Sequence, residues 1–261
     1  MNICDITMDR FDECKGLLYS INPRMTDEQW KVIFKSPWTD DAPGIGIEVD
    51  GVIGGIMMLI TSKREIEGNV LRVCAPSTWV VDPDYRQYSL GLLQHLMATD
   101  YDIIVTHTLS DVAYRMFKIF KMVDYEDSKY VILPGFGMEK FNAFDNQLVR
   151  DHQFPGCVAL AANGYEVILK RICKIKKGVK LTFFELLYTN QPLDNRILKK
   201  LSSHLFLKHF SGGLLVDSRF TTGKISGFKY DNRKLCRANI EHPENLDNLY
   251  SELALMSRGY P

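Results

Sequence analysis

The stretch TWVVDPDYRQYSLGLL, residues 78–93, decides the fold of this chain. An apolar strand is expected to end at Pro83, a polar loop holds Arg86, and a leucine-rich helix begins near Ser89. Such a strand–loop–helix junction points backbone N–H groups and the positive end of a helix at one spot. The junction predicts a site for a phosphate or pyrophosphate, and a plain strand-to-helix turn is the alternative that local features leave open.

The segments around this junction alternate between strands and helices. The clearest signal is Asp50-Gly51 between two apolar runs, because both residues tolerate the positive φ of a two-residue hairpin turn. Thr26, followed by two acidic residues, suits a helix N-terminus. The pattern predicts strands over 45–49, 52–60, 70–81 and 102–106, and helices over 14–21, 26–34, 89–98 and 110–121.

The second half of the chain is less regular, and no internal sequence repeat is visible. It contains no stretch comparable to 81–91, so we expect no second phosphate site there. The predicted division is a domain over 1–134, a connector over 135–155, and a C-terminal α/β domain or extension over 156–261. Within the second half we expect strands over 165–175, 179–187 and 214–216, and helices over 194–209 and 245–256.

The junction resembles the acyl-CoA-binding motif of the GNAT superfamily of N-acyltransferases. In that family a strand ending in V-x-P-x-Y-R leads to a [Q/R]-x-x-G-x-[G/A] loop. Here Val81, Pro83, Tyr85 and Arg86 match, and residues 86–91 cover the loop. The resemblance spans about residues 1–134 and implies a GNAT-like α/β fold with a mixed (α+β) sheet.

The resemblance also implies acetyl-CoA as co-substrate, without a metal. The pyrophosphate would bind the loop, and pantetheine would lie along the strand at 79–81, where that strand splays from the one at 102–106. The implied CoA-binding residues are Trp79, Val80, Val81, Arg86, Gln87, Tyr88, Ser89, Leu90, Gly91 and Ser110.

Two positions depart from the family pattern. Ser89 replaces the first loop glycine, which requires the serine to keep a negative φ. Phe117 stands where the family often has the tyrosine that protonates the leaving thiolate. The remaining catalytic candidates are His107 as a base and Tyr114 as a proton source. Without geometry, the more ordinary interpretations are a hydrogen-bonded histidine at a strand end and a core aromatic residue.

Composition excludes several classes of protein. Lys plus Arg and Asp plus Glu each number 32, and the zero net charge argues against a nucleic-acid partner. The longest apolar stretch, 52–60, is far shorter than the roughly 20 residues of a membrane span. The N-terminus lacks the apolar core of a signal peptide. The six cysteines are dispersed, which favours reduced thiols over a zinc site. We therefore expect a cytoplasmic protein.

These observations favour an acyl-CoA-dependent N-acyltransferase, an acetyltransferase first of all, in which a neutral amine attacks the thioester directly. The layout is similar to acetyltransferases of bacterial surface polysaccharide synthesis, which suggests an amino sugar or nucleotide sugar as the small-molecule acceptor. A non-catalytic acyl-CoA-binding or protein-interaction module is the main alternative. An aminoacyl transferase using charged tRNA is a third, weakened by the neutral charge. The oligomeric state stays open.

Overall fold

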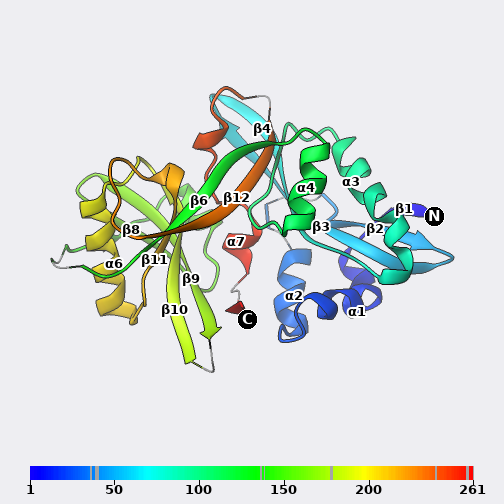
Figure 1. The fold of residues 1–261 in the computed structure, drawn as a ribbon, viewed down its shortest axis with the longest axis horizontal. Coiled ribbons are helices and arrows are strands. Elements are labelled where there is room, and N and C mark those ends of the chain that lie inside the picture. Colours follow the sequence, from blue (N-terminus) through cyan, green and yellow to red (C-terminus); the bar gives the residue numbers. More distant parts are fainter. Residues whose placement is uncertain are drawn as a thin grey trace. The chain divides into compact units, whose positions relative to one another are not determined.

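A computed structural model of the chain describes residues 1–35, 37–38, 41–135, 137, 139–176, 179–238, 240–256 and 259–260. Its contacts divide into two compact units (Figure 1). The division is not a single cut, because two short segments of unit 1 lie between segments of unit 2 in the sequence. Unit 1 comprises Met1–Val123, Leu235–Glu241 and Tyr250–Glu252, and unit 2 comprises Asp124–Lys234, His242–Leu249 and Leu253–Pro261.

Unit 1 is built on a mixed sheet in the order β1-β2-β3-β4-β5. Its strands are β1 (Asn2–Asp5), β2 (Gly44–Val49), β3 (Val52–Ile66), β4 (Asn69–Val81) and β5 (Ile103–Val105). Neighbours are antiparallel except β4 and β5, which are parallel. The last residues of β12 (Phe228–Ala238) pair antiparallel with β5. The helices of this unit are η1 (Met8–Arg10), α1 (Phe11–Ile21), α2 (Asp27–Phe34), η2 (Pro83–Tyr88), α3 (Ser89–Met97) and α4 (Asp111–Ile119).

Local sequence explains the turns and one helix start. Asp50 and Gly51 both have positive φ, 50° and 80°, so the predicted hairpin is confirmed. Glu67-Gly68 closes the β3–β4 hairpin in the same way, with φ of 52° and 76°. Thr26 caps α2 in a reciprocal capping box with Gln29, which confirms the predicted N-terminus.

One core cluster of unit 1 is formed by strands and helices on both sides of the junction at 78–93. β2, β3, β4, β5, α3 and α4 all contribute buried side chains to it. Leucines of α3 and Phe117 of α4 lie in this cluster, so both helices are held by burial of their apolar stripes. The cluster comprises Ile45, Ile47, Met57, Leu59, Cys74, Leu92, Leu93, Leu96, Ile104, Phe117, Met122 and Leu235.

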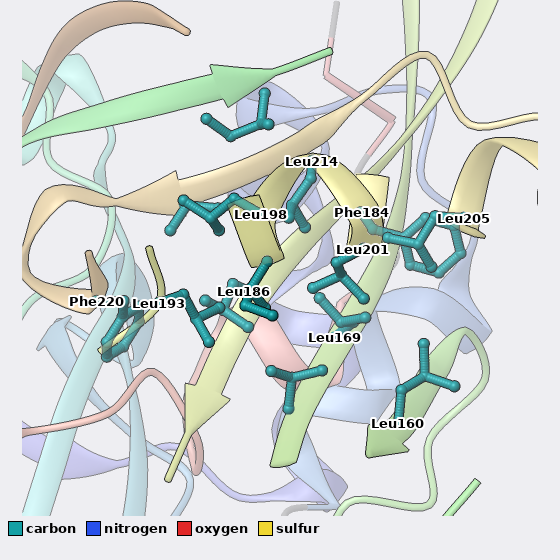
Figure 2. Close-up of a cluster of buried hydrophobic side chains, with 14 of the residues drawn as sticks. Leu160, Leu169, Phe184, Leu186, Leu193, Leu198, Leu201, Leu205, Leu214 and Phe220 are labelled. Atoms are coloured by element: carbon teal, nitrogen blue, oxygen red, sulfur yellow. The ribbon is translucent and has the colours of Figure 1, made fainter. Parts of the chain in front are cut away.

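The remaining elements lie mainly in unit 2, whose strands follow the order β6-β11-β10-β9-β8-β7, with β13 beside β9. The strands are β6 (Val123–Ile132), β7 (Asn142–Ala143), β8 (Cys157–Ala162), β9 (Tyr165–Lys176), β10 (Val179–Thr189), β11 (Leu214–Asp217) and β13 (Gly259–Tyr260). The helices are α5 (Gln147–Asp151), α6 (Asn195–His209), η3 (Ser218–Phe220), η4 (Pro243–Asn245) and α7 (Glu252–Leu255). Leucines of α6 pack onto β9, β10 and β11 in a second core (Figure 2).

Both units use the same order of elements, as the strands and helices predicted for each half of the sequence already indicate. In unit 1 the antiparallel pair β3–β4 is followed by α3 and then by β5, parallel to β4. In unit 2 the antiparallel pair β9–β10 is followed by α6 and then by β11, parallel to β10. Each antiparallel pair also contains a register shift, between Ile56 and Met58 and between Leu186 and Tyr188. Unit 2 therefore contains a strand–loop–helix junction, between β10 and α6, where the sequence predicted a strand over 179–187 and a helix over 194–209.

The structure confirms the mixed α/β fold class and corrects the expected bounds of one strand and one helix. β3 continues to Ile66 instead of ending at residue 60. The expected connector 135–155 contains β7 and α5. The expected helix over 245–256 is reduced to Glu252–Leu255. It cannot run through Tyr250, whose φ of 54° is left-handed, and Asn248 is buried with its side chain hydrogen-bonded to charged groups.

Candidate functional site

The junction at 78–93 has the predicted order of strand, loop and helix. β4 ends at Val81, η2 forms the loop, and α3 begins at Ser89. The loop is braced internally: the Asp82 carboxylate accepts from the Asp84 amide at 3.0 Å, and the Tyr85 amide donates to the Asp82 carbonyl at 2.9 Å. The Ser89 amide donates to the Arg86 carbonyl, so this donor is already used inside the turn.

Two glycines of β3 allow the end of β4 and the loop to lie close to the sheet. A Cβ built on Gly54 would lie 2.4 Å from the Tyr85 ring, and one on Gly55 would lie 2.8 Å from a Val81 methyl group. The Asp82 amide also donates to the Gly54 carbonyl at 2.9 Å. The loop thus rests on a strip of β3 that has no side chains. Our sequence reasoning missed this contribution, although the adjacent glycines within an apolar run were visible.

The N-terminal end of α3 is free of a side-chain cap. Tyr88 occupies the N-cap position and makes no side-chain hydrogen bond there. The first turn of an α-helix has backbone N–H groups without acceptors in the helix, and its end carries a partial positive charge. Ser89 has a φ of −54°, so it keeps the negative φ that a serine needs in place of the first loop glycine. Next to this helix end, Arg86 and Gln87 are exposed, and Gly91 is half-buried.

The strand that leads into the loop carries a bulge. The β3–β4 register jumps between Ile56 and Met58, and Thr78, within the extra stretch of β4, has φ of 54°. The parallel ladder to β5 covers Val73↔Ile103 and Cys74↔Ile104, so the described ladder ends before the bulge. Trp79 shares the extra stretch with Thr78, Val80 and Val81 follow it, and all three are half-buried. This geometry agrees with the predicted divergence of β4 from β5.

Several of the predicted residues pack against the same core cluster. Trp79, Val81, Tyr88 and Tyr114 all lie against the cluster that contains Phe117. The rings of Trp79 and Phe117 meet edge to face, with centroids 6.0 Å apart and an interplanar angle of 75°. Phe117 is buried, so its ring is part of the core next to the bulge.

The other catalytic and binding candidates have different surroundings. His107 follows β5 by two residues and is 2% exposed, which removes it from solvent. The adjacent Thr106 is hydrogen-bonded to Leu235 of β12 through its amide, at 2.9 Å, and its hydroxyl. Ser110 caps α4 by accepting from the Ala113 amide at 3.2 Å. A local capping role therefore accounts for Ser110.

Unit 2 has a buried group of charged side chains that sequence reasoning missed. Asp217, at the end of β11, accepts from Lys234 at 2.5 Å and from Asn248 at 2.8 Å. Lys129 and Arg219 also lie 3.4 Å from this carboxylate. Burial would raise the pKa of Asp217, but the three cations outweigh it and hold the pKa well below its usual range. Burial also lowers the pKa of Lys234, to about 8. The residues are too far apart in sequence for a local pattern to join them.

Among the side chains that the structure describes, no group of three or more His, Cys, Asp or Glu is placed to hold a metal ion. Within the same described part of the chain, no helix is long and apolar enough to cross a membrane.

Comparison with known proteins shows which solved structures have a similar fold. No protein-family model and no curated protein matches the sequence. Among solved structures, a GCN5-related N-acetyltransferase from Kribbella flavida aligns with a TM-score of 0.57 at 10% identity, covering 91% of this chain and 71% of its own. One from Anabaena variabilis aligns with a TM-score of 0.55 at 9% identity, over 90% and 72%. Saccharomyces cerevisiae N-myristoyltransferase with bound myristoyl-CoA aligns with a TM-score of 0.52 at 10% identity, over 95% and 83%. The chain therefore has the GNAT fold, as its sequence motif predicted.

Proposed function

We propose that this protein is an acyl-CoA-dependent N-acyltransferase that binds acetyl-CoA at the β4–η2–α3 junction and transfers the acetyl group to an amine. The observation that carries the proposal is this junction, with Arg86 beside an uncapped helix end, on a fold shared with N-acetyltransferases. Positive helix ends and backbone amides are suited to phosphate groups. A cytoplasmic location belongs to the same proposal, since all six cysteines are free thiols.

In the proposed complex the pyrophosphate lies against residues 86–91, where Arg86 supplies a charge-assisted contact. Pantetheine follows Trp79, Val80 and Val81 along β4, with Gln87, Tyr88, Ser89, Leu90 and Gly91 around the phosphates. The thioester then lies at the bulge, where a backbone amide released from the ladder can stabilise the oxyanion. Ser110, which caps α4, completes the proposed set of CoA-binding residues.

The acceptor in this proposal is a small amine, with an amino sugar or nucleotide sugar as the first class to test. The neutral amine attacks the thioester carbonyl, the C–S bond breaks, and the proton lost by the amine goes to a base. We assign that base to His107, which needs a local opening to reach substrate because it is buried. The departing thiolate takes a proton from Tyr114 or from water, because the side chain of Phe117 has no acidic proton. A thiol whose pKa in water is about 8.5 is a tolerable leaving group near neutral pH.

A non-catalytic acyl-CoA-binding module is the second candidate. One observation favours it: the buried Phe117 occupies the position of the usual general acid. Loss of a general acid costs on the order of 10²–10⁴ in rate. Weak transfer is therefore the expected behaviour of an enzyme at this site, whereas binding without any transfer is the expected behaviour of a module.

The test is isothermal titration calorimetry with acetyl-CoA, followed by a transfer assay over a panel of amines that includes amino sugars. Arg86→Glu places a negative charge beside the pyrophosphate, so we expect at least tenfold weaker binding and a smaller salt dependence. Arg24→Glu, a reversal at another exposed arginine of unit 1, should change the affinity less than twofold. Equal binding by wild type and Arg86→Glu would contradict the proposed site. Tyr114→Phe and His107→Ala should each lower turnover. If the wild type binds acetyl-CoA but transfers the acetyl group only at the background rate, the non-catalytic binding module is the function that remains.

A further inference from the structure

We infer that Trp79 and Phe117 form a wall at the thioester end of the site that restricts the acyl group to acetyl or propionyl. This inference rests on the proposed function, because it assumes that CoA binds at the β4–η2–α3 junction. It goes beyond that function by assigning the acyl-chain specificity to two side chains of this chain.

The direction of the cofactor along β4 brings its thioester to these rings. With the pyrophosphate at residues 86–91, the pantetheine arm runs back along the strand from Val81. A strand advances about 3.3 Å per residue, so the stretch from Val81 back to Thr78 spans about 10 Å. The arm therefore reaches the bulge, where Thr78 has its left-handed φ. The described β4–β5 ladder lies farther back along β4, at Val73 and Cys74.

The aromatic pair occupies the region immediately beside the bulge. Trp79 is the residue that follows Thr78, and its ring meets the Phe117 ring edge to face at 6.0 Å. Phe117 is 3% exposed and is anchored in a core with Leu92, Leu93 and Leu96 of α3. A longer acyl chain would have to displace a buried ring, because a close-packed core has little free volume for extra methylene groups.

The backbone fold does not itself set this limit. N-myristoyltransferase, whose structure contains myristoyl-CoA, has a similar fold. The side chains beside the thioester can therefore set the acyl length, and in this chain the two large rings beside the bulge are placed to do so. Removing ring volume there should extend the accepted chain without disturbing the phosphate contacts at 86–91.

The experiment measures the dissociation constants of CoA, acetyl-CoA, butyryl-CoA and hexanoyl-CoA by calorimetry, so it needs no acceptor. For the wild type we expect CoA and acetyl-CoA to bind equally within about threefold. Butyryl-CoA should bind more weakly than acetyl-CoA, and hexanoyl-CoA at least tenfold more weakly. In Phe117→Leu, the dissociation constant of hexanoyl-CoA should exceed that of acetyl-CoA by about threefold or less. Trp79→Leu provides a second variant should Phe117→Leu fail to fold. Phe120→Leu, which trims a half-buried ring against the same cluster, should leave the ratio unchanged.

The outcomes separate this inference from the function on which it rests. If neither CoA nor any acyl-CoA binds the folded wild type, both the proposed function and the inferred limit on acyl length are overturned. If CoA and acetyl-CoA bind but hexanoyl-CoA binds equally well, the wall alone is overturned. The wall is also overturned if the wild type binds hexanoyl-CoA more weakly than acetyl-CoA but neither Phe117→Leu nor Trp79→Leu reduces the ratio of the two dissociation constants. It is likewise overturned if Phe120→Leu reduces this ratio as much as they do.

Discussion

At the scale of single residues, the contact between Tyr85 and Gly54 determines where the loop lies. The tyrosine belongs to the sequence motif, whereas the glycine lies in another strand, 31 residues earlier. The ring occupies the space that a side chain on Gly54 would need. The motif tyrosine is thus explained as an anchor for the loop, and its effect on a ligand is indirect.

The first prediction follows from this contact. Gly54→Ala should destabilise the protein by about 1–3 kcal/mol, because the new methyl group overlaps the Tyr85 ring. It should also weaken CoA binding, since the loop must move with the ring. Urea denaturation and calorimetry measure the two effects. Gly16→Ala is the control: its Cβ meets nothing within 4 Å in helix α1, so a gain of about 0.5–1 kcal/mol is expected. A Gly54→Ala protein as stable as the wild type would show that Tyr85 is not an anchor.

At the scale of elements, hairpins and helix caps followed local chemistry, while long-range polar contacts did not. Asp50-Gly51 was recognised as a turn, and Glu67-Gly68 and Asn163-Gly164 have the same positive φ values and could have been recognised as well. The terminal helix was overestimated because its apolar residues suggested a helix. Asn248 instead lies in the buried charged group around Asp217, which no local pattern indicates.

This charged group gives a prediction about pH. The pKa of Asp217 is depressed in the folded state, so its ionised form stabilises the fold above the unfolded carboxyl pKa of about 3.9. That contribution is lost as the pH falls below this value toward the folded pKa. Asp217→Asn should cost about 3–5 kcal/mol at pH 7, because it removes the carboxylate paired with buried Lys234, whereas Lys129 keeps Glu185 and Arg219 keeps Glu126.

Urea unfolding at pH 7 and pH 3 measures the effect, and the difference between Asp217→Asn and the wild type should shrink at pH 3. Asp145→Asn removes an exposed ion pair with Arg150 and should cost less than about 1 kcal/mol. A difference that stays constant between the two pH values would mean that Asp217 is not the titrating group.

At the scale of the whole molecule, the repeated order of elements raises the question of a second CoA site in unit 2. The equivalent helix start there is closed. The Asp194 carboxylate caps α6 by accepting from the Ile197 amide at 2.9 Å, and the buried Leu193 is backbone-bonded to Phe220 and Thr222. A carboxylate at this helix end satisfies the donor and opposes the charge that a phosphate would bring.

We therefore predict that one CoA binds per chain. Calorimetric titration should saturate at a stoichiometry of one, and Arg86→Glu should remove most of the binding. Arg196→Glu, at the exposed second position of α6, should leave both stoichiometry and affinity within twofold. A stoichiometry of two, or a loss of binding in Arg196→Glu, would assign a ligand site to unit 2.

The sequence by itself determined the β4–η2–α3 junction, the Asp-Gly hairpin and the capped start of α2. These depend on contacts between residues close in the chain, so their signals are local. Only the tertiary structure decided that Phe117 packs against Trp79 and that Tyr85 rests on Gly54. It also revealed the shared charges around Asp217 and the parallel pairing of β10 with β11. Each of these joins distant segments through packing, strand pairing or buried charge, and side-chain volume and desolvation take effect only once the chain has folded.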